Sequence, residues 1–308
     1  MSGADVPAIS AIVVNRNAGP HLHECLERLR VVAAEERFRD DGLEIILVDN
    51  ASTDGSTEAV RRLQERGPES RPPVRLIALE RNVGFGAGCN RAARDAAGRY
   101  LLLLNPDAWI DGPSLRRLVE ALDGDSRLGI AAPGLHYPDG SPQLGWAAPV
   151  GVVGEAIQKF RNRFEGRAWS HELLPRLLRP LLGQGWFSAA CLLVRRSAFE
   201  EVGGFDEGFF LYFEDADLGV RLHRQDWRQR QVKGAGACHL RGVTTGRPGT
   251  RLLSPAVERF YRASQLRYYD LHRPRWERSY LRRRLRRKFS RVADEEQRTA
   301  LLRLLEGL

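Results

Sequence analysis

The sequence predicts an α/β fold in which helices cover both faces of a largely parallel sheet. Short apolar runs alternate with amphipathic segments over residues 1–137, the pattern of strands joined by covering helices. The runs are apolar at almost every position, so both faces of the sheet are expected to be buried. Polar side chains follow several runs, at the carboxyl ends where an open α/β sheet binds its ligand.

Each run in the first half is interpreted as one strand because it is short and rich in Val, Ile or Leu. The predicted strands are Ile9 to Asn15, Leu43 to Asp49, Val74 to Glu80, Tyr100 to Asn105 and Gly129 to Tyr137. The segments between them have the spacing of amphipathic helices. The predicted helices are His21 to Arg30, Ser56 to Arg66, Gly86 to Ala97 and Ser114 to Leu122.

The second half begins at a turn over Pro138 to Ser141, after which residues 145–185 have no regular pattern and are interpreted as an insertion. Beyond the insertion, the sequence predicts a buried strand and then a short helix that is capped by Ser197 and ended by two glycines. The remaining predicted elements are that strand at Cys191 to Val194, a helix at Glu214 to Arg224 and a last strand at Ala235 to His239.

The charge of the chain is concentrated at its end. Among 308 residues there are 48 Lys and Arg against 39 Asp and Glu, a formal charge of +9. Residues 259–308 hold 15 basic and 6 acidic side chains, so the tail carries the whole excess. A domain that binds a polyanion would spread positive charge over its own surface, and this class of protein is therefore disfavoured.

Four cysteines, at positions 25, 89, 191 and 238, lie among apolar or small residues without metal-ligand spacing, and we interpret them as buried free thiols in a reducing compartment. No basic segment precedes the first apolar run, so no signal peptide is expected. No run approaches the roughly 18 apolar residues of a spanning helix. We expect a cytoplasmic protein that contacts a membrane only at its surface.

Polar side chains lie at the carboxyl ends of three predicted strands. They are Asn15, Asp49 and the segment Asn105-Pro106-Asp107. A carboxylate after a strand can accept hydrogen bonds from a base or sugar, and Asp107 suits Mg²⁺ or Mn²⁺ that holds a diphosphate. The alternatives are helix capping just after Asp49 and an Asx turn at Asp107. The glycine-rich segment from Asn82 to Gly88 could face a diphosphate with its backbone N–H groups, or simply form a tight turn.

Three carboxylates open the helix that begins at Glu214, directly after an aromatic segment. The helix dipole stabilises acids there, but like charges crowded beside aromatic rings also raise the proton affinity of at least one, as a general base requires. Asp217 and Arg221 have the spacing of a helical ion pair, which leaves Glu214 and Asp215 as candidate bases. His239 follows the last strand as either a structural histidine or a metal ligand.

Taken together, these segments resemble glycosyltransferase family 2, especially its rhamnosyltransferase-like branch. The resemblance covers about Ala8 to Gly246 and is carried, in the family's order, by Asp49, Asn82 to Ala92, Asn105 to Asp107, Phe187 to Arg196, Gly203 to Glu207, Glu214 to Leu218 and His239. It implies a GT-A fold with a Rossmann-like mixed sheet, a nucleotide-diphosphate-sugar donor, a divalent metal and inversion at the anomeric carbon. The chain then divides into a GT-A domain, residues 1–250, with a nucleotide-binding half (1–137) and an acceptor half (138–250), and a basic helical extension, residues 251–308.

The resemblance also implies residue roles. Asp49 matches the acid that binds the base or ribose, Asp107 the last carboxylate of the metal-binding D-x-D motif, Asp215 the catalytic base, and His239 a histidine that joins the metal in some members. The expected site has two further groups of residues. The nucleotide-sugar side also contains Asn15, Asn82, Gly84 and Asn105, and the acceptor side contains Trp186, Ser188 and Glu214. Asn105 replaces the first acid of D-x-D, so the metal would depend on one carboxylate, His239, phosphate oxygens and water.

In the tail, four apolar residues recur at helical spacing beside the run Arg282 to Lys288: Leu281, Leu285, Phe289 and Val292. A helix with a narrow apolar stripe and a basic remainder suits an anionic membrane surface. The alternative is a solvated helix packed on the body through its stripe.

The expected protein is thus a metal-dependent inverting glycosyltransferase at the inner face of the cell membrane. It would move a sugar, with dTDP-rhamnose favoured over a UDP-sugar as donor, to a saccharide or lipid-linked acceptor in cell-envelope polysaccharide synthesis. No nucleic-acid partner is expected. The rival hypotheses are a nucleic-acid-associated protein that uses the basic tail and a sugar-nucleotide binder without catalysis.

Overall fold

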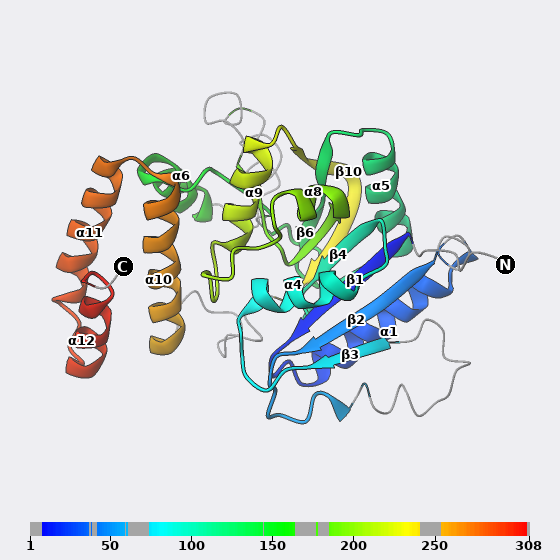
Figure 1. Ribbon diagram of the computed structural model, residues 1–308, viewed down its shortest axis with the longest axis horizontal. Helices are drawn as coiled ribbons and strands as arrows, with labels where there is room; N and C mark the ends of the chain where they lie inside the picture. The colour runs from blue at the N-terminus through cyan, green and yellow to red at the C-terminus, as the bar shows by residue number, and fades with distance from the viewer. Residues whose placement is uncertain are drawn as a thin grey trace.

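An eight-stranded mixed sheet forms the centre of the structure, in the order β3-β2-β1-β4-β9-β6-β10-β5 (Figure 1). The structure is a computed structural model that describes residues 8–36, 38, 42–58, 60, 74–143, 145–163, 177, 185–240 and 254–306. The first four strands in this order come from the first half of the chain, and beyond β4 the second-half strands β9 and β10 alternate with β6 and β5 of the first half.

The first-half strands agree closely with the sequence prediction. They are β1 (Ile9–Asn15), β2 (Leu43–Asp49), β3 (Val74–Ala78), β4 (Tyr100–Leu104) and β6 (Leu128–His136). The bounds of β1 and β2 are those predicted, and the others differ at their ends by one or two residues. β1 pairs in parallel with β2 and β4, and β2 with β3, so these strands all end at one edge.

Helices bury both faces of the sheet, as the apolar strands predict. Ala11 and Val13 of β1 face a core shared with α1 (Pro20–Ala34) and α5 (Gly112–Asp123). Ile12, between them, faces a second core shared with α4 (Phe85–Asp95). This alternation follows from the two-residue side-chain period of a strand. Most of the predicted helix over residues 56–66 lies outside the described residues.

The second half inserts an antiparallel strand, β9 (Cys191–Arg195), between β4 and β6. β10 (Arg228–His239) is longer than predicted because its irregular pairing with β6 hides the alternation of a strand. β5 (Ala108–Ile110) was not predicted, since three residues show no periodicity. The helix α9 (Glu214–Arg224) has the predicted bounds. The Ser197 cap is wrong: α8 (Arg196–Glu201) begins earlier, with Arg195 as its N-cap.

The predicted insertion contains regular structure. β7 (Trp146–Ala147) and β8 (Trp186–Phe187) form a separate two-stranded sheet, and α6 (Val152–Asn162) lies between them in the chain. Residues 164–176 and 178–184 lie outside the described part. The two-stranded sheet therefore joins the start and the end of the insertion.

Three helices follow at one end of the molecule: α10 (Pro255–His272), α11 (Arg275–Phe289) and α12 (Glu295–Arg303) (Figure 1). They form a third core with aromatic residues that precede α9. Leu281, Leu285 and Phe289 are buried there, and Val292 is partly buried. The prediction that this stripe meets a membrane is wrong, because three of its four residues are buried in the core that α11 shares with α10 and α12. No helix in the described ranges combines the length and apolarity needed to span a bilayer.

All four cysteines are buried and free, as predicted. Burial raises the pKa of the Cys25 and Cys89 thiols well above the ordinary value, so neither is ionised near neutral pH. Cys25 and Cys191 pack in one main core and Cys89 in the other.

Candidate active site

One edge of the sheet gathers the predicted site residues. β1, β2 and β4 end there, and the antiparallel β9 begins there, because Leu104 pairs with Cys191. β10 also ends at this edge, where His239 pairs with Ala108 of β5. Five of the predicted site residues lie at or just after these strand ends. The topology therefore brings together Asn15, Asp49, Asn105, Asp107 and His239.

Asn15 and Asp49 are joined at the ends of β1 and β2. The Asn15 Nδ2 donates to Asp49 Oδ1 at 3.3 Å, to Ser52 Oγ at 3.0 Å and to Ser56 Oγ at 2.8 Å. Asn15 is fully buried, so it orders the loop after β2 and presents no open group. Asp49 also accepts a hydrogen bond from the Ser52 N–H at 3.3 Å. This bond fixes the loop just after Asp49, where capping was the alternative to a ligand role.

Asn50, which sequence reasoning missed, clamps the loop from Asn82 to Gly84. Its Oδ1 accepts from the Val83 N–H at 2.8 Å, and its Nδ2 donates to the Gly84 carbonyl at 3.1 Å. Asn82 accepts from the Gly84 N–H at 3.0 Å. The only sequence signal was that Asn50 directly follows Asp49 at a strand end. The glycine-rich loop is thus fixed to the Asp49 side of the site.

Gly84 needs to be glycine for two reasons. Its φ is +89°, and an added Cβ would lie 2.3 Å from the Phe210 carbonyl oxygen. The loop therefore touches the turn that precedes α9 through bare backbone.

Replacing Gly84 with Ala should displace this loop and lower the free energy of unfolding by roughly 1–3 kcal/mol. Donor affinity should fall with it. Thermal unfolding and donor titration measure both effects. Gly140→Ala is the matched control, because Gly140 has a φ of +79° but an added Cβ meets nothing within 4 Å. Equal effects of the two substitutions would contradict the close approach to Phe210.

Asp107 and His239 form a buried pair. Asp107 is 2% exposed, and its Oδ1 has no hydrogen-bond partner. This oxygen lies 3.5 Å from His239 Nε2, and Asn105 Nδ2 lies 3.4 Å from the same nitrogen. A buried carboxylate oxygen without a donor fits a cation, which would satisfy it. Within the described residues, no cluster of three or more His, Cys, Asp or Glu could hold a metal.

The ring of His239 is held from behind by Gln143, another residue that sequence reasoning missed. Gln143 Nε2 donates to the His239 carbonyl at 3.1 Å, and Gln143 Oε1 lies 2.7 Å from His239 Nδ1. Since a carbonyl only accepts, this geometry assigns the amide orientation, and the proton to Nδ1. The lone pair of Nε2 then faces Asn105 and Asp107.

Asp215 lies in the first turn of α9, next to the segment that enters β9. Its Oδ2 accepts from the Ala189 N–H at 3.3 Å, and its Oδ1 from the Ala216 N–H at 2.8 Å. Burial raises the pKa of Asp215 to about 7, against the opposing effect of these hydrogen bonds. The next residue, Ala190, accepts from the Asn105 N–H at 2.9 Å. One short segment thus joins the candidate base to the Asp107 side of the site.

Glu214 lies behind Asp215. It is buried, its Oε2 has no hydrogen-bond partner, and its Cβ packs toward Gly86 of α4. Burial and then the neighbouring Asp215 raise the pKa of Glu214 well above its ordinary value. The acceptor-side role of Glu214 stays a prediction, and its carboxyl is enclosed in this structure. The crowded acids do show the raised proton affinity that the sequence predicts.

Trp186 and Ser188, the other acceptor-side predictions, lie in and just after β8, which packs on α9. Both are half-buried. Ser188 Oγ accepts from the Ala190 N–H at 3.3 Å, while the indole nitrogen of Trp186 is buried without a hydrogen-bond partner. Their position beside Asp215 is compatible with the predicted role.

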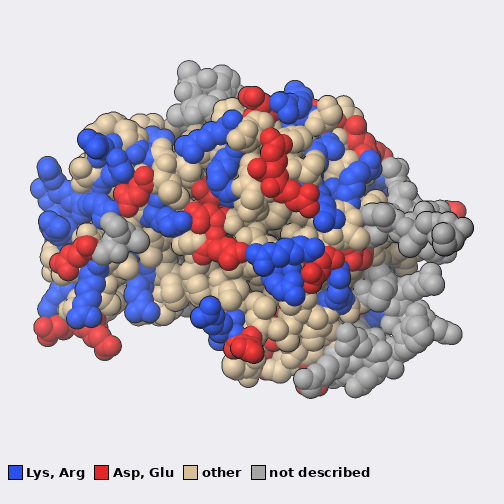
Figure 2. All heavy atoms as spheres, in the orientation of Figure 1, with Lys and Arg blue, Asp and Glu red and all other residues tan. Residues whose placement is uncertain are grey.

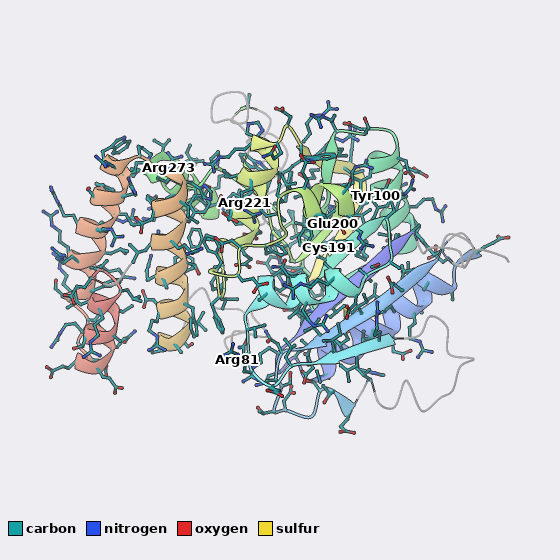
Figure 3. The ribbon with its side chains drawn as sticks, in the orientation of Figure 1. Arg81, Tyr100, Cys191, Glu200, Arg221 and Arg273 are labelled. Carbon is teal, nitrogen blue, oxygen red and sulfur yellow. The ribbon has the colours of Figure 1, made fainter. Side chains whose placement is uncertain are left out.

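The C-terminal helices support the start of α9. The predicted pair of Asp217 and Arg221 is present at 2.7 Å, and His272 Nε2 of α10 lies 2.7 Å from the other carboxylate oxygen of Asp217 (Figure 3 labels Arg221). Tyr212 and Phe213 have φ values of +68° and +69°, a strained conformation for aromatic residues. Phe213 packs on rings of α10, and the tail is therefore part of the site's scaffold.

Solved structures identify the fold as that of GT-A glycosyltransferases. The chain matches a mannosyltransferase from Pyrobaculum calidifontis in complex with GDP-Man and Mn²⁺, with a TM-score of 0.56, 17% identity, and coverage of 97% of this chain and 70% of that one. It matches GalNAc-T7 with UDP, GalNAc and Mn²⁺ at a TM-score of 0.63, with 16% identity over 98% of this chain and 55% of the other. The predicted mixed sheet with a helical C-terminal region is confirmed.

Sequence comparison gives the family. The chain belongs to glycosyl transferase family 2, whose model matches residues 10–203. It is 34% identical over 256 residues to an N-acetylglucosaminyl-diphospho-decaprenol L-rhamnosyltransferase of Mycobacterium tuberculosis (strain CDC 1551 / Oshkosh), covering 78% of each chain. It is 31% identical to the O-antigen biosynthesis protein RfbC of Myxococcus xanthus, over 72% of this chain and 16% of that protein. The predicted family, with its rhamnosyltransferase-like character, is confirmed.

Proposed function

We propose that this glycosyltransferase transfers L-rhamnose from dTDP-rhamnose to a lipid-linked saccharide in cell-envelope polysaccharide synthesis, with inversion at the anomeric carbon. The observation that carries the mechanism is the raised pKa of Asp215 beside the segment that leads to Asn105 and Asp107. The donor and acceptor are suggested by the rhamnosyltransferase relative, whose name contains both the sugar and a diphospho-decaprenol acceptor.

In this proposal the donor lies along the sheet edge. Asp49 accepts hydrogen bonds from the base or ribose, and the clamped loop with Asn82 and Gly84 lines the nucleotide. Asn105 and Asp107 lie at the diphosphate. Asp107 and His239 would hold Mg²⁺ or Mn²⁺, which when bound supplies positive charge that neutralises the departing diphosphate. The unpartnered Oδ1 of Asp107 supports this assignment.

Asp215 acts as the general base. Its ionised carboxylate takes the proton of the acceptor hydroxyl, whose oxygen bonds to the anomeric carbon as the bond from that carbon to the diphosphate oxygen breaks. The products are the glycosylated acceptor, a nucleoside diphosphate and protonated Asp215. Burial and the neighbouring Asp215 raise the pKa of Glu214, which disfavours a second negative charge behind the base.

The pH dependence of turnover tests this role. The rate should fall about tenfold per pH unit below about 7, because protonated Asp215 cannot accept a proton, and should level off above that value. An ordinary Asp would remain ionised and active down to about pH 5. The measurement is kcat under saturating donor and metal across this range. A flat profile between about pH 5 and 7 would rule out a base with a raised pKa.

A thermal-shift screen of nucleotide sugars, with and without Mg²⁺ or Mn²⁺, tests the donor assignment. dTDP-rhamnose should stabilise the protein more than other nucleotide sugars, and metal should increase the shift, since a ligand that binds only the folded state raises its stability. No shift with any nucleotide sugar would contradict the proposal. A shift without any transfer would favour the rival hypothesis of a catalytically silent binder.

A further inference from the structure

The outward side of α11 carries exposed aromatic and basic residues. Trp276 and Tyr280 are 61% and 47% exposed, and Arg283 and Arg287 continue the same side at exposed positions. Spacings of four, three and four residues place these four side chains on one face of a helix, which we name the outer face. The buried stripe of α11 lies on the opposite side of the helix, where it packs against α10 and α12. Two residues turn an α-helix by about 200°, which is the rotation between the outer face and this stripe.

Part of the unpaired positive charge of α11 lies on the outer face. Three of its basic residues are neutralised by acids of other elements: Arg282 by Asp270, Arg284 by Glu155 and Lys288 by Glu258. Glu277, the sole acid in α11, is buried against Arg273. In the described part of the chain, the other arginines of α11 have no ion pair, and two of them, Arg283 and Arg287, lie on the outer face. Figure 2 shows Lys and Arg side chains gathered over this end of the molecule.

We propose that the outer face of α11 docks on an anionic lipid bilayer. Unpaired arginines match lipid phosphates, and exposed Trp and Tyr rings suit the headgroup region, where their apolar body and polar tip are both accommodated. The buried stripe does not contact lipid, so α11 lies on the membrane surface and does not insert into the bilayer. The inference rests on the proposed function in one respect: a lipid-linked acceptor confines the second substrate to the same plane.

The test is co-sedimentation of the full chain with phosphatidylcholine vesicles, with and without phosphatidylglycerol. The wild type should bind only the anionic vesicles. Arg283→Glu with Arg287→Glu should weaken binding at least about 30-fold, since each basic residue near such a surface contributes about 1 kcal/mol. Trp276→Ser with Tyr280→Ser should also weaken binding without changing charge. These residues are exposed, so thermal unfolding should remain that of the wild type.

The matched control is Arg117→Glu with Lys233→Glu. Both residues are exposed, the change in net charge is the same, and α5, which contains Arg117, lies at the opposite end of the molecule from α11 (Figure 1). Equal loss of binding in the control would overturn the outer face as the docking surface. Binding to single-stranded DNA but not to anionic vesicles would overturn the proposal that the partner is a lipid bilayer. Transfer to a water-soluble acceptor should survive in every variant, so failure of docking is separable from failure of the proposed function.

A second inference concerns Gln143, and it stands on a separate observation. The two hydrogen bonds of Gln143 to His239 keep the proton on Nδ1 and point the Nε2 lone pair toward Asp107. We infer that Gln143 is a positioning residue for the divalent cation. A residue that fixes a ligating imidazole in this way typically contributes 10- to 100-fold in metal affinity.

Titration of Mn²⁺ in the presence of dTDP, followed by electron paramagnetic resonance, tests this role without using activity. Gln143→Leu should weaken Mn²⁺ binding about 10- to 100-fold. Gln143→Glu keeps an acceptor for the Nδ1 proton but loses the donor to the His239 carbonyl, so it should recover part of the affinity that Gln143→Leu loses. Wild-type affinity in the Leu variant, or equal losses in both, would overturn the inference. If the wild type does not bind Mn²⁺ with dTDP, the metal assignment itself fails.

Discussion

Replacing Asp215 with Asn should lower turnover by about 10²- to 10⁴-fold and leave donor affinity near that of the wild type. The amide keeps the size of the side chain and an oxygen that accepts from the Ala189 N–H, but it cannot take a proton from the acceptor. The loss should therefore appear in kcat and not in donor binding. Steady-state kinetics and donor calorimetry on the folded variant separate the two.

Glu214→Gln is the matched control for this substitution. Glu214 is the adjacent acid, and burial raises its pKa, which favours the neutral carboxyl. An amide therefore resembles its working state, and turnover should stay within a few-fold of the wild type. A large loss in Glu214→Gln together with near-normal turnover in Asp215→Asn would exchange the roles of the two carboxylates.

Asp107→Ala should abolish the dependence of donor binding on metal. Asp107 supplies the only carboxylate oxygen that the described structure leaves buried and unpartnered beside His239. Without it, imidazole alone holds the cation weakly, since hard cations prefer oxygen ligands. Calorimetry of dTDP-rhamnose with and without Mn²⁺ measures the difference between the two affinities.

Asp139→Ala serves as the control for Asp107→Ala. Asp139 lies in an exposed turn, where it accepts hydrogen bonds from Ser141, so its loss should leave the effect of metal unchanged. If Asp107→Ala still binds the donor more tightly with Mn²⁺ than without, Asp107 is not the metal ligand.

The strand ends could be predicted from the sequence because their signals are local. Apolar runs give β1 and β2 with their observed bounds, and a polar residue after a run marks the edge of the sheet. The acids at the start of α9 were recognised in the same way. Asp49, Asp107 and His239 therefore lie at one edge, where parallel strands must end together, and Asp215 meets this edge from α9 through the Ala189 N–H.

The missed residues depend on contacts between distant segments. Gln143 meets His239 across 96 positions, and His272 meets Asp217 across 55. Nothing in the sequence around Gln143 or His272 indicates these partners. The same reason explains the error over the apolar stripe of α11, because periodicity shows that a face is buried but not whether protein or lipid covers it.

The most direct test of the central claim is transfer from dTDP-rhamnose to an N-acetylglucosaminyl-diphospho-polyprenol acceptor, with the anomeric configuration of the product read by nuclear magnetic resonance. The wild type with Mg²⁺ or Mn²⁺ should form one product whose anomeric configuration is opposite to that of the donor, and Asp215→Asn should form almost none. Retention of configuration, or unchanged transfer by Asp215→Asn, would contradict single displacement with Asp215 as the base.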